Sequence, residues 1–183
     1  MAMRVIAQGL RWLVWTMNVL AGVALILMTA LVVLATVMRY FVGAPLMFSD
    51  ELVGLLFCGT SFLAIPISLL QRRHISVDIV VGNLPDRGRR LIDVLAVLIF
   101  ITFAAAFIYN AFDFADFSRQ IGSSSDIGSL LLWPWMMVLP ATFLVAALIA
   151  LIQLVDAVRI LFGRPPLMEE NRELHARGQE LHA

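Results

Sequence analysis

Apolar residues fill four long stretches of the chain, and the short segments between them hold most of the charged residues. The stretches cover residues 12–38, 52–70, 91–112 and 132–155. Crossing the hydrocarbon core of a bilayer takes about 20 helical residues, each rising ~1.5 Å. Because lipid offers no hydrogen-bond partners, each stretch must satisfy its own backbone as an α-helix. The pattern predicts an all-α integral membrane protein of four transmembrane helices, with short interfacial or protruding helical segments.

Composition leaves little room for a soluble module. The chain has 183 residues, of which 61% are hydrophobic and 14% are charged. Soluble domains are nearer about 45–50% apolar and 25% charged. We therefore expect a transmembrane domain over residues 1–165 and a polar cytoplasmic tail over residues 166–183. The net charge is zero, so nothing indicates nucleic acid as a partner.

The arginines predict how the chain is oriented, because positively charged loops stay on the cytoplasmic side. Eleven arginines flank the stretches on one side and two on the other. The larger group consists of Arg4, Arg11, Arg72, Arg73, Arg87, Arg89, Arg90, Arg159, Arg164, Arg172 and Arg177. The smaller group is Arg39 and Arg119. Both termini and the middle loop are therefore predicted to be cytoplasmic, and residues 39–50 and 113–130 to face outward.

Helix ends are marked by local residue choices. Ser49 is predicted to cap the second helix, with Asp50 and Glu51 in its positive first turn. Asp86 follows a proline and is predicted to start the third helix. A helix-like pattern continues beyond that apolar stretch, which predicts a protruding third helix that ends at a turn of Gly122 and three serines. Its polar face would hold Tyr109, Asp113, Asp116 and Gln120.

Tryptophans and small residues indicate membrane boundaries and packing seams. Indoles favour the membrane–water interface, so interfacial anchors are predicted at Trp12 and Trp15 on the inner side and at Trp133 and Trp135 on the outer side. Small residues at four-residue spacing let helices approach closely in lipid. They occur as Thr60, Ala64 and Ser68 in the second helix and as Thr142, Ala146 and Ala150 in the fourth. These stripes are read as helix-packing seams, the alternative being chance, and Pro66 and Pro140 are expected to kink their helices or adjust them locally.

The middle of each stretch lacks the residues of transport or redox chemistry. Ionisable residues at mid-depth are costly and usually functional, and none falls there in this sequence. The three histidines lie in loops or in the tail, where they cannot ligate a haem held between helices. We expect no cofactor, no metal ion and no enzymatic activity, and we expect the chain alone neither to bind nor to move a polar solute.

Two polar clusters remain as candidate sites. Arg39 lies close in sequence to Asp50 and Glu51, so an ion pair could tie the first helix to the second; the alternative is ordinary interfacial capping. The second cluster follows the second helix and contains Arg73, His74 and Asp78. Its arginines could contact anionic lipid headgroups, although plain positive-inside topology explains them as well. Two potential ligands alone do not make a metal site.

The clusters occur in an order that resembles the small membrane subunit, the DctQ type, of tripartite ATP-independent periplasmic (TRAP) transporters. The matching segments are Arg39-Tyr40-Phe41, Ser49-Asp50-Glu51-Leu52, His74-Ile75-Ser76-Val77-Asp78, Leu84-Pro85 and Trp133-Pro134-Trp135 followed by Pro140. Order and spacing agree over roughly residues 12–160. Phe48 stands where that family usually has a tryptophan.

The resemblance implies a function that composition alone does not. It implies a small scaffold subunit, without a catalytic role, in the bacterial cytoplasmic (inner) membrane. Its partners would be a large multi-helix membrane subunit, a periplasmic solute-binding protein and membrane lipids, and the complex would import an organic acid with a coupling ion, sodium in this interpretation. The alternative is a membrane anchor for a redox or signalling complex.

Overall fold

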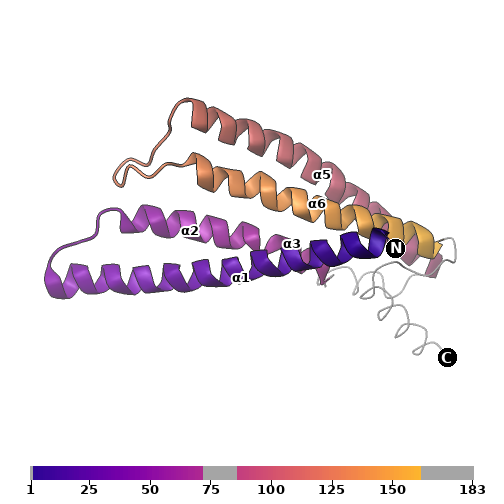
Figure 1. Ribbon diagram of the computed structural model, residues 1–183, viewed down its shortest axis with the longest axis horizontal. Coiled ribbons are helices and arrows are strands. Elements are labelled where there is room, and N and C mark those ends of the chain that lie inside the picture. Colours follow the sequence, from indigo (N-terminus) through magenta and orange to yellow (C-terminus); the bar gives the residue numbers. More distant parts are fainter. Residues whose placement is uncertain (1, 72–85, 162–183) are drawn as a thin grey trace. The chain divides into compact units, whose positions relative to one another are not determined.

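The structure, a computed structural model, describes residues 2–71 and 86–161. These residues form the helices α1 (Ala2–Val37), η1 (Met38–Val42), α2 (Ser49–Leu63), α3 (Ile65–Leu70), α5 (Asp86–Gln120) and α6 (Trp133–Leu161) (Figure 1). Four stretches are long and apolar enough to cross a membrane, namely Gln8–Val42, Ser49–Leu70, Val94–Gln120 and Trp133–Arg159. No strand occurs within the described ranges. The predicted all-α chain with four membrane-spanning helices is confirmed.

Local chemistry explains where the helices end. α5 begins at Asp86 and extends to Gln120, and Gly122 follows in the left-handed region at a φ of 61°. The predicted start and the predicted extension of this helix are both confirmed. A break at Ala64 separates α2 from α3. Pro66 restricts the backbone of the residue before it, Ile65, and the break lies one residue earlier. α6, by contrast, continues through Pro140.

The described residues pack as two compact units, which we describe separately. Unit 1 lies within Met1–Val14, Pro66–Ala105 and Val145–Ala183, and unit 2 comprises Trp15–Ile65 and Ala106–Leu144. Helices α1, α5 and α6 therefore each contribute residues to both units. In unit 1, the Nε2 atom of Gln153 donates a 2.8 Å hydrogen bond to the carbonyl of Leu69 near the end of α3. This bond satisfies a carbonyl that the helix end leaves without an intrahelical partner.

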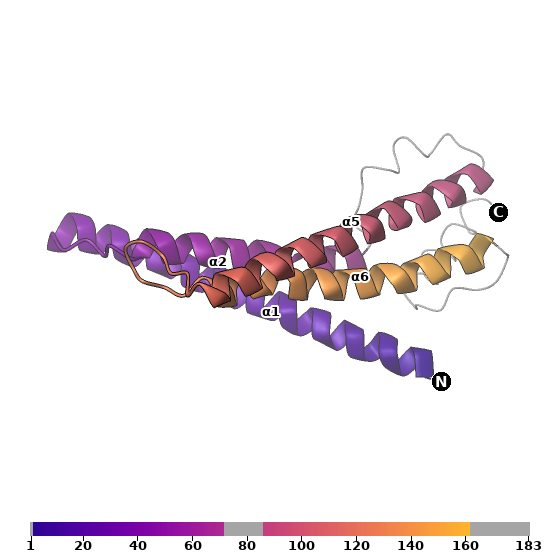
Figure 2. The ribbon, with the colours of Figure 1, turned by 90° about the horizontal axis from the view of Figure 1, so that it is seen from above.

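Three phenylalanines join three helices inside unit 2. The ring centroid of Phe107 on α5 lies 4.1 Å from that of Phe143 on α6 and 6.0 Å from that of Phe62 on α2. Phe62 and Phe143 are themselves 6.1 Å apart. Aromatic pairs at such distances add to the energy of apolar burial. Within this unit α2 runs beside α1, and α6 runs beside α5 (Figures 1 and 2).

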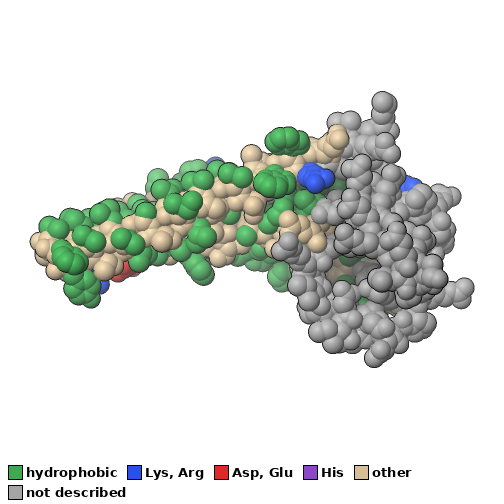
Figure 3. Space-filling model, turned by 90° about the horizontal axis from the view of Figure 1, so that it is seen from below, with side chains coloured by type: hydrophobic (Ala, Val, Ile, Leu, Met, Phe, Trp, Pro, Cys, Tyr) green, Lys and Arg blue, Asp and Glu red, His purple; other side chains and the backbone are tan. Residues whose placement is uncertain are grey.

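Burial differs sharply among the four spans. In α6, 44% of the apolar window is buried within the chain, against 22% in the α2–α3 span and 6% in each of α1 and α5. Hydrophobic side chains accordingly lie along the whole described surface that faces the viewer in Figure 3, interspersed with backbone and other side chains. α6 is thus the most buried of the four spans, while α1 and α5 leave most of their apolar windows exposed.

Candidate interaction site

The first candidate residue, Arg39, lies in the widened last turns of the first span. The π-helix η1 ends at Gly43, which adopts the left-handed conformation at a φ of 71°. The chain then returns toward α2, and Nη2 of Arg39 comes within 3.9 Å of Oδ2 of Asp50. Their side chains are 55% and 84% exposed. Such an exposed pair contributes only about 0–1 kcal/mol to the stability of the isolated chain.

Ser49 does not act as the cap that the sequence predicts. The N-cap position of α2 belongs to Phe48, and no side chain accepts a hydrogen bond there. The hydroxyl of Ser49 instead donates a 2.7 Å bond to the carbonyl of Leu46. A serine caps only when its oxygen accepts from an N–H of the first turn. Asp50 and Glu51 do occupy the first turn of α2, where the helix dipole favours negative charge.

Glu51 makes the densest set of polar contacts at this end of unit 2, and it makes them with a distant segment. Its carboxylate accepts hydrogen bonds from the Ser125 hydroxyl at 2.7 Å, from the Ile127 N–H at 2.9 Å and from the Gly128 N–H at 2.7 Å. All three donors belong to the α5–α6 connection, which we define as residues 121–132. Hydrogen bonds to an ionised acceptor are stronger than neutral ones. Through these hydrogen bonds, Glu51 links the start of α2 to the α5–α6 connection.

The α5–α6 connection is internally ordered around that carboxylate. Ser125 makes two hydrogen bonds with Leu130. Its N–H donates to the Leu130 carbonyl at 2.9 Å, and its hydroxyl accepts from the Leu130 N–H at 3.0 Å. Gly128 lies so close to α2 that a Cβ there would come within 3.0 Å of both Oε2 of Glu51 and Cβ of Phe48. Only glycine fits at this position without a shift of its neighbours.

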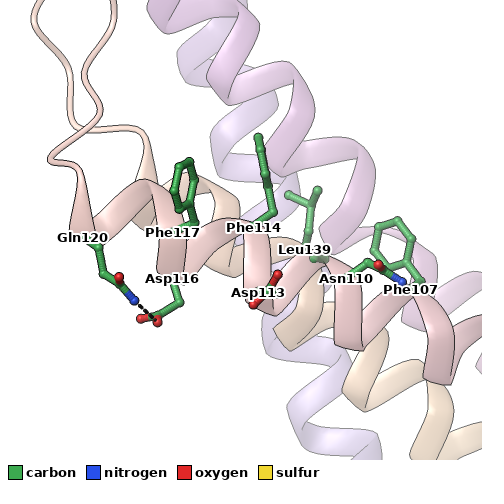
Figure 4. Close-up of a pocket in the computed structure, with 9 residues that line it drawn as sticks. Phe107, Asn110, Asp113, Phe114, Asp116, Phe117, Gln120 and Leu139 are labelled. Atoms are coloured by element: carbon green, nitrogen blue, oxygen red, sulfur yellow. Dashed lines mark hydrogen bonds between the residues drawn. The ribbon is translucent and has the colours of Figure 1, made fainter.

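A hollow of about 790 Å³ opens beside the last turns of α5 in unit 2. Its lining combines carboxylates and amides with phenylalanine rings: Phe107, Asn110, Ala111, Asp113, Phe114, Asp116, Phe117, Gln120 and Leu139. Figure 4 shows the carboxylates of Asp113 and Asp116 on one side of α5 and the rings of Phe114 and Phe117 on the other. Of the predicted polar face of this helix, Asp113, Asp116 and Gln120 border the hollow, and Tyr109 is not among the lining residues.

Part of the charge around the hollow is balanced locally. The Nε2 atom of Gln120 donates a 2.8 Å bond to Oδ2 of Asp116, and Nε of Arg119 lies 3.7 Å from Oδ1 of the same carboxylate. Asn110 donates to the carbonyl of Ala106, one helical turn earlier. Asp113 is exposed. The hollow thus combines an accessible negative charge with aromatic surface.

The two stripes of small residues differ in burial. Thr142, Ala146 and Ala150 on α6 are all completely buried. On the other stripe, Thr60 and Ala64 are half-buried and Ser68 is exposed. The Thr142 hydroxyl donates to the carbonyl of Leu139, at 2.9 Å. A seam inside the chain therefore fits the α6 stripe better than the α2–α3 stripe.

The predicted tryptophan anchors also differ in how far their side chains are exposed. Trp12 and Trp15 on α1 are 78% and 55% exposed. Trp133 and Trp135 on α6 are half-buried, and the indole of Trp135 lies against Gly59 of α2, 3.8 Å from where a Cβ would be. The interfacial role of all four remains a prediction. Trp135 in addition packs α6 against α2.

Some predicted site residues lie outside the described residues, and some contacts of the site are not predicted from the sequence. Arg73, His74 and Asp78 lie outside the described residues. The sequence predicts Ser125 as a turn residue but does not predict that it or Gly128 contacts Glu51, because both lie more than 70 residues from Glu51 along the chain. Within the described residues, no group of three or more potential metal ligands gathers.

Comparison with known proteins identifies the chain's family. The sequence profile of the DctQ component of tripartite ATP-independent periplasmic transporters matches residues 28–160, well over half of the chain. The chain belongs to the DctQ family. It is therefore a TRAP transporter small permease subunit and a multi-pass membrane protein, and the expected resemblance is confirmed.

Two curated relatives agree with this membership. The chain is 32% identical over 92 residues to a putative TRAP transporter small permease protein of Haemophilus influenzae, covering 47% of this chain and 56% of the relative. It is 27% identical over 118 residues to the isethionate TRAP transporter permease protein DctMQ of Oleidesulfovibrio alaskensis, covering 64% of this chain and 19% of the relative. The matched part is thus about half of one relative and about a fifth of the other.

Proposed function

We propose that this DctQ-family chain is the scaffold subunit of a secondary-active transporter that imports an organic acid together with a coupling ion, sodium in this proposal. Its partners are a large membrane subunit, which carries the solute, and a periplasmic solute-binding protein, which delivers it. The observation that carries this proposal is the family match over residues 28–160. The chain is proposed to have no catalytic role and no cofactor.

The placement of charge supports a scaffold over a conduit. In the described spans, ionisable side chains lie near the ends, as with Arg11, Glu51, Asp116 and Asp156. A path for a polar solute or a cation needs polar groups at mid-depth. The middle third of the described spans carries no charged side chain and only scattered uncharged polar ones such as Asn110, so the solute path is assigned to the large subunit.

The hollow on α5 supports a protein neighbour. Asn110, Asp113 and Asp116 belong to the stretch Val94–Gln120, which is apolar enough to span the membrane. Polar side chains within such a stretch usually face protein or a water-filled cavity, because lipid leaves them unpartnered. We assign this face to the large subunit, and we retain Arg73, His74 and Asp78 as proposed contacts at the opposite side of the membrane.

The proposed orientation in the bacterial inner membrane places both termini in the cytoplasm, on the strength of the arginine bias. Fusion of alkaline phosphatase after Ser124 is expected to give an active enzyme, because that position would be periplasmic. Fusions after Arg87 or at the C-terminus are expected to be inactive. Phosphatase activity at the C-terminus would contradict the orientation.

Reconstitution tests the division of labour. Liposomes that contain this chain alone, with an inward sodium gradient, are expected to take up no more radiolabelled organic acid than empty vesicles. Uptake is expected only when the large subunit and the binding protein are added together with this chain. Saturable uptake by the chain alone would overturn the scaffold assignment, and full uptake without the chain would show that it is dispensable.

A further inference from the structure

The α5–α6 connection exposes large apolar side chains together with polar ones, although it is not helical. Ile121, Ile127 and Leu131 are 61%, 62% and 54% exposed. Ser124, Asp126 and Ser129 are exposed as well, whereas the Ser125 hydroxyl donates to the Glu51 carboxylate. Apolar and polar side chains exposed together suit a segment that lies at a membrane–water interface.

The backbone of the connection is also unusually well satisfied. Most of its N–H groups donate to acceptors within the chain: those of residues 121, 122, 123, 125, 127, 128, 130 and 132. Two of these bonds end on the carboxylate of Glu51. Unsatisfied backbone groups are what exclude irregular segments from lipid. By accepting two of these N–H groups, Glu51 removes part of the cost that would otherwise keep this connection in water.

The position of the α5–α6 connection within unit 2 also favours contact with the membrane. Figures 1 and 2 both show the α1–α2 connection farther toward this end of the unit than the α5–α6 connection. At that farther end the first span still exposes Tyr40, Phe41 and Val42, next to the charged side chain of Arg39. The α5–α6 connection thus lies at the level of apolar helix surface.

We propose that the α5–α6 connection inserts into the interfacial region of the lipid bilayer, with Glu51 as the positioning residue that makes insertion possible. Ile121, Ile127 and Leu131 contact the upper acyl chains. The exposed carboxylate of Asp126 sets the depth at the headgroups, where water still reaches it. Trp133, an aromatic residue of the type enriched at interfaces, begins the helix that follows.

Lipid is favoured over a protein occupant by the composition of this surface. Its exposed large side chains are aliphatic, whereas protein interfaces are enriched in aromatic residues and arginine. The mixed polar and aromatic surface that a protein partner would recognise is the hollow on α5. A lipid neighbour needs no shape complementarity and no hydrogen bonds from the surface that it covers.

Site-directed fluorescence in the full-length chain tests the proposal. Cys58 is the one cysteine of the sequence, so a Cys58→Ala background accepts single labels. A polarity-sensitive fluorophore is attached at Ile127→Cys and, as a lipid reference, at Ala106→Cys on α5, whose native residue is exposed. The conjugate of the same fluorophore with free cysteine in buffer is the water reference. The chain is reconstituted alone in phospholipid vesicles.

The label at Ile127→Cys is expected to emit at shorter wavelength than the water reference and to be quenched several-fold less by aqueous iodide. A nitroxide high on the acyl chain should quench it more strongly than a nitroxide deep in the bilayer, with the reverse order at Ala106→Cys. Iodide quenching as strong as that of the water reference would overturn the proposal. Shielding that arises only after the large subunit is added would also overturn it, because the occupant would then be protein.

Glu51→Ala tests the positioning role within the same experiment. Loss of the carboxylate leaves the Ser125 hydroxyl and two N–H groups to be hydrated, so iodide quenching at Ile127→Cys is expected to rise toward that of the water reference. Asp50→Ala, the matched control on the neighbouring residue, should leave it unchanged. Helical content and the label at Ala106→Cys verify that each variant is folded. A folded Glu51→Ala chain with unchanged quenching would refute the role of Glu51.

Discussion

Substitution of Gly128 by alanine tests the contact between α2 and the α5–α6 connection most directly. The added methyl group would lie 3.0 Å from Oε2 of Glu51, 3.0 Å from Cβ of Phe48 and 3.3 Å from Cγ of Leu130. Carboxylate oxygens can rotate away, but a Cβ moves only with its backbone. The connection must therefore shift, and the hydrogen bond from the Gly128 N–H to Glu51 must lengthen.

Overpacking of this kind typically costs about 1–3 kcal/mol. The free energy of unfolding of Gly128→Ala is expected to fall by that amount, which corresponds to roughly 2–4 °C in melting temperature per kcal/mol for a chain of this size. The half-buried thiol of Cys58 provides the assay: a thiol-reactive fluorogenic dye reports its exposure as the detergent-solubilised protein is heated.

Gly54→Ala is the matched control, because a Cβ at this exposed position of α2 meets nothing within 4 Å. Alanine in a helix interior is favoured over glycine by about 0.5–1 kcal/mol, so this variant should melt at the wild-type temperature or slightly above. The double variant Gly128→Ala with Glu51→Ala should lose less stability than the two single losses added together, because both act on one contact. The reasoning fails if Gly128→Ala melts as high as Gly54→Ala.

Two further predictions concern the same unit. Arg39→Ala should change the melting temperature little, since its exposed pair with Asp50 contributes about 0–1 kcal/mol, yet we expect it to weaken pull-down of the large subunit. Arg11→Ala, at an exposed position near the other end of α1, is the control. Wild-type pull-down and uptake by Arg39→Ala would reduce the pair to interfacial capping. Phe143→Ala should lower the free energy of unfolding by about 3–5 kcal/mol, because its buried ring joins α6 to α5 and α2. Phe57→Ala, at a 62% exposed position of α2, should cost far less, and equal losses in the two thermal melts would contradict the aromatic core.

The sequence alone predicts the features that depend on local pattern. The four apolar helices, the start of α5 at Asp86 and its extension to Gln120 all follow from periodicity and from end-capping chemistry within a few residues. The resemblance carried by short motifs likewise depends on order along the chain, and the family match confirms it.

Features that depend on which hydrogen-bond partner lies within reach, near or far along the chain, were out of reach or were predicted wrongly. Ser49 has the right residue type for a cap, but the carbonyl of Leu46 lies within reach of its hydroxyl. Glu51 was grouped with Arg39 because they are near in sequence, whereas its carboxylate binds Ser125 and Gly128. Sequence spacing cannot reveal which of several nearby carboxylates meets a segment more than 70 residues away.

The contact between Glu51 and the α5–α6 connection also constrains the order of biogenesis. Glu51 enters the membrane with α2, but the Gly128 N–H that it binds lies 77 residues later in the chain. During synthesis its carboxylate must therefore stay hydrated until α5 has been inserted and the α5–α6 connection has been synthesised. The start of α2 acquires its final surroundings only with the last hairpin, so truncation before residue 128 should leave even the first hairpin in an immature state.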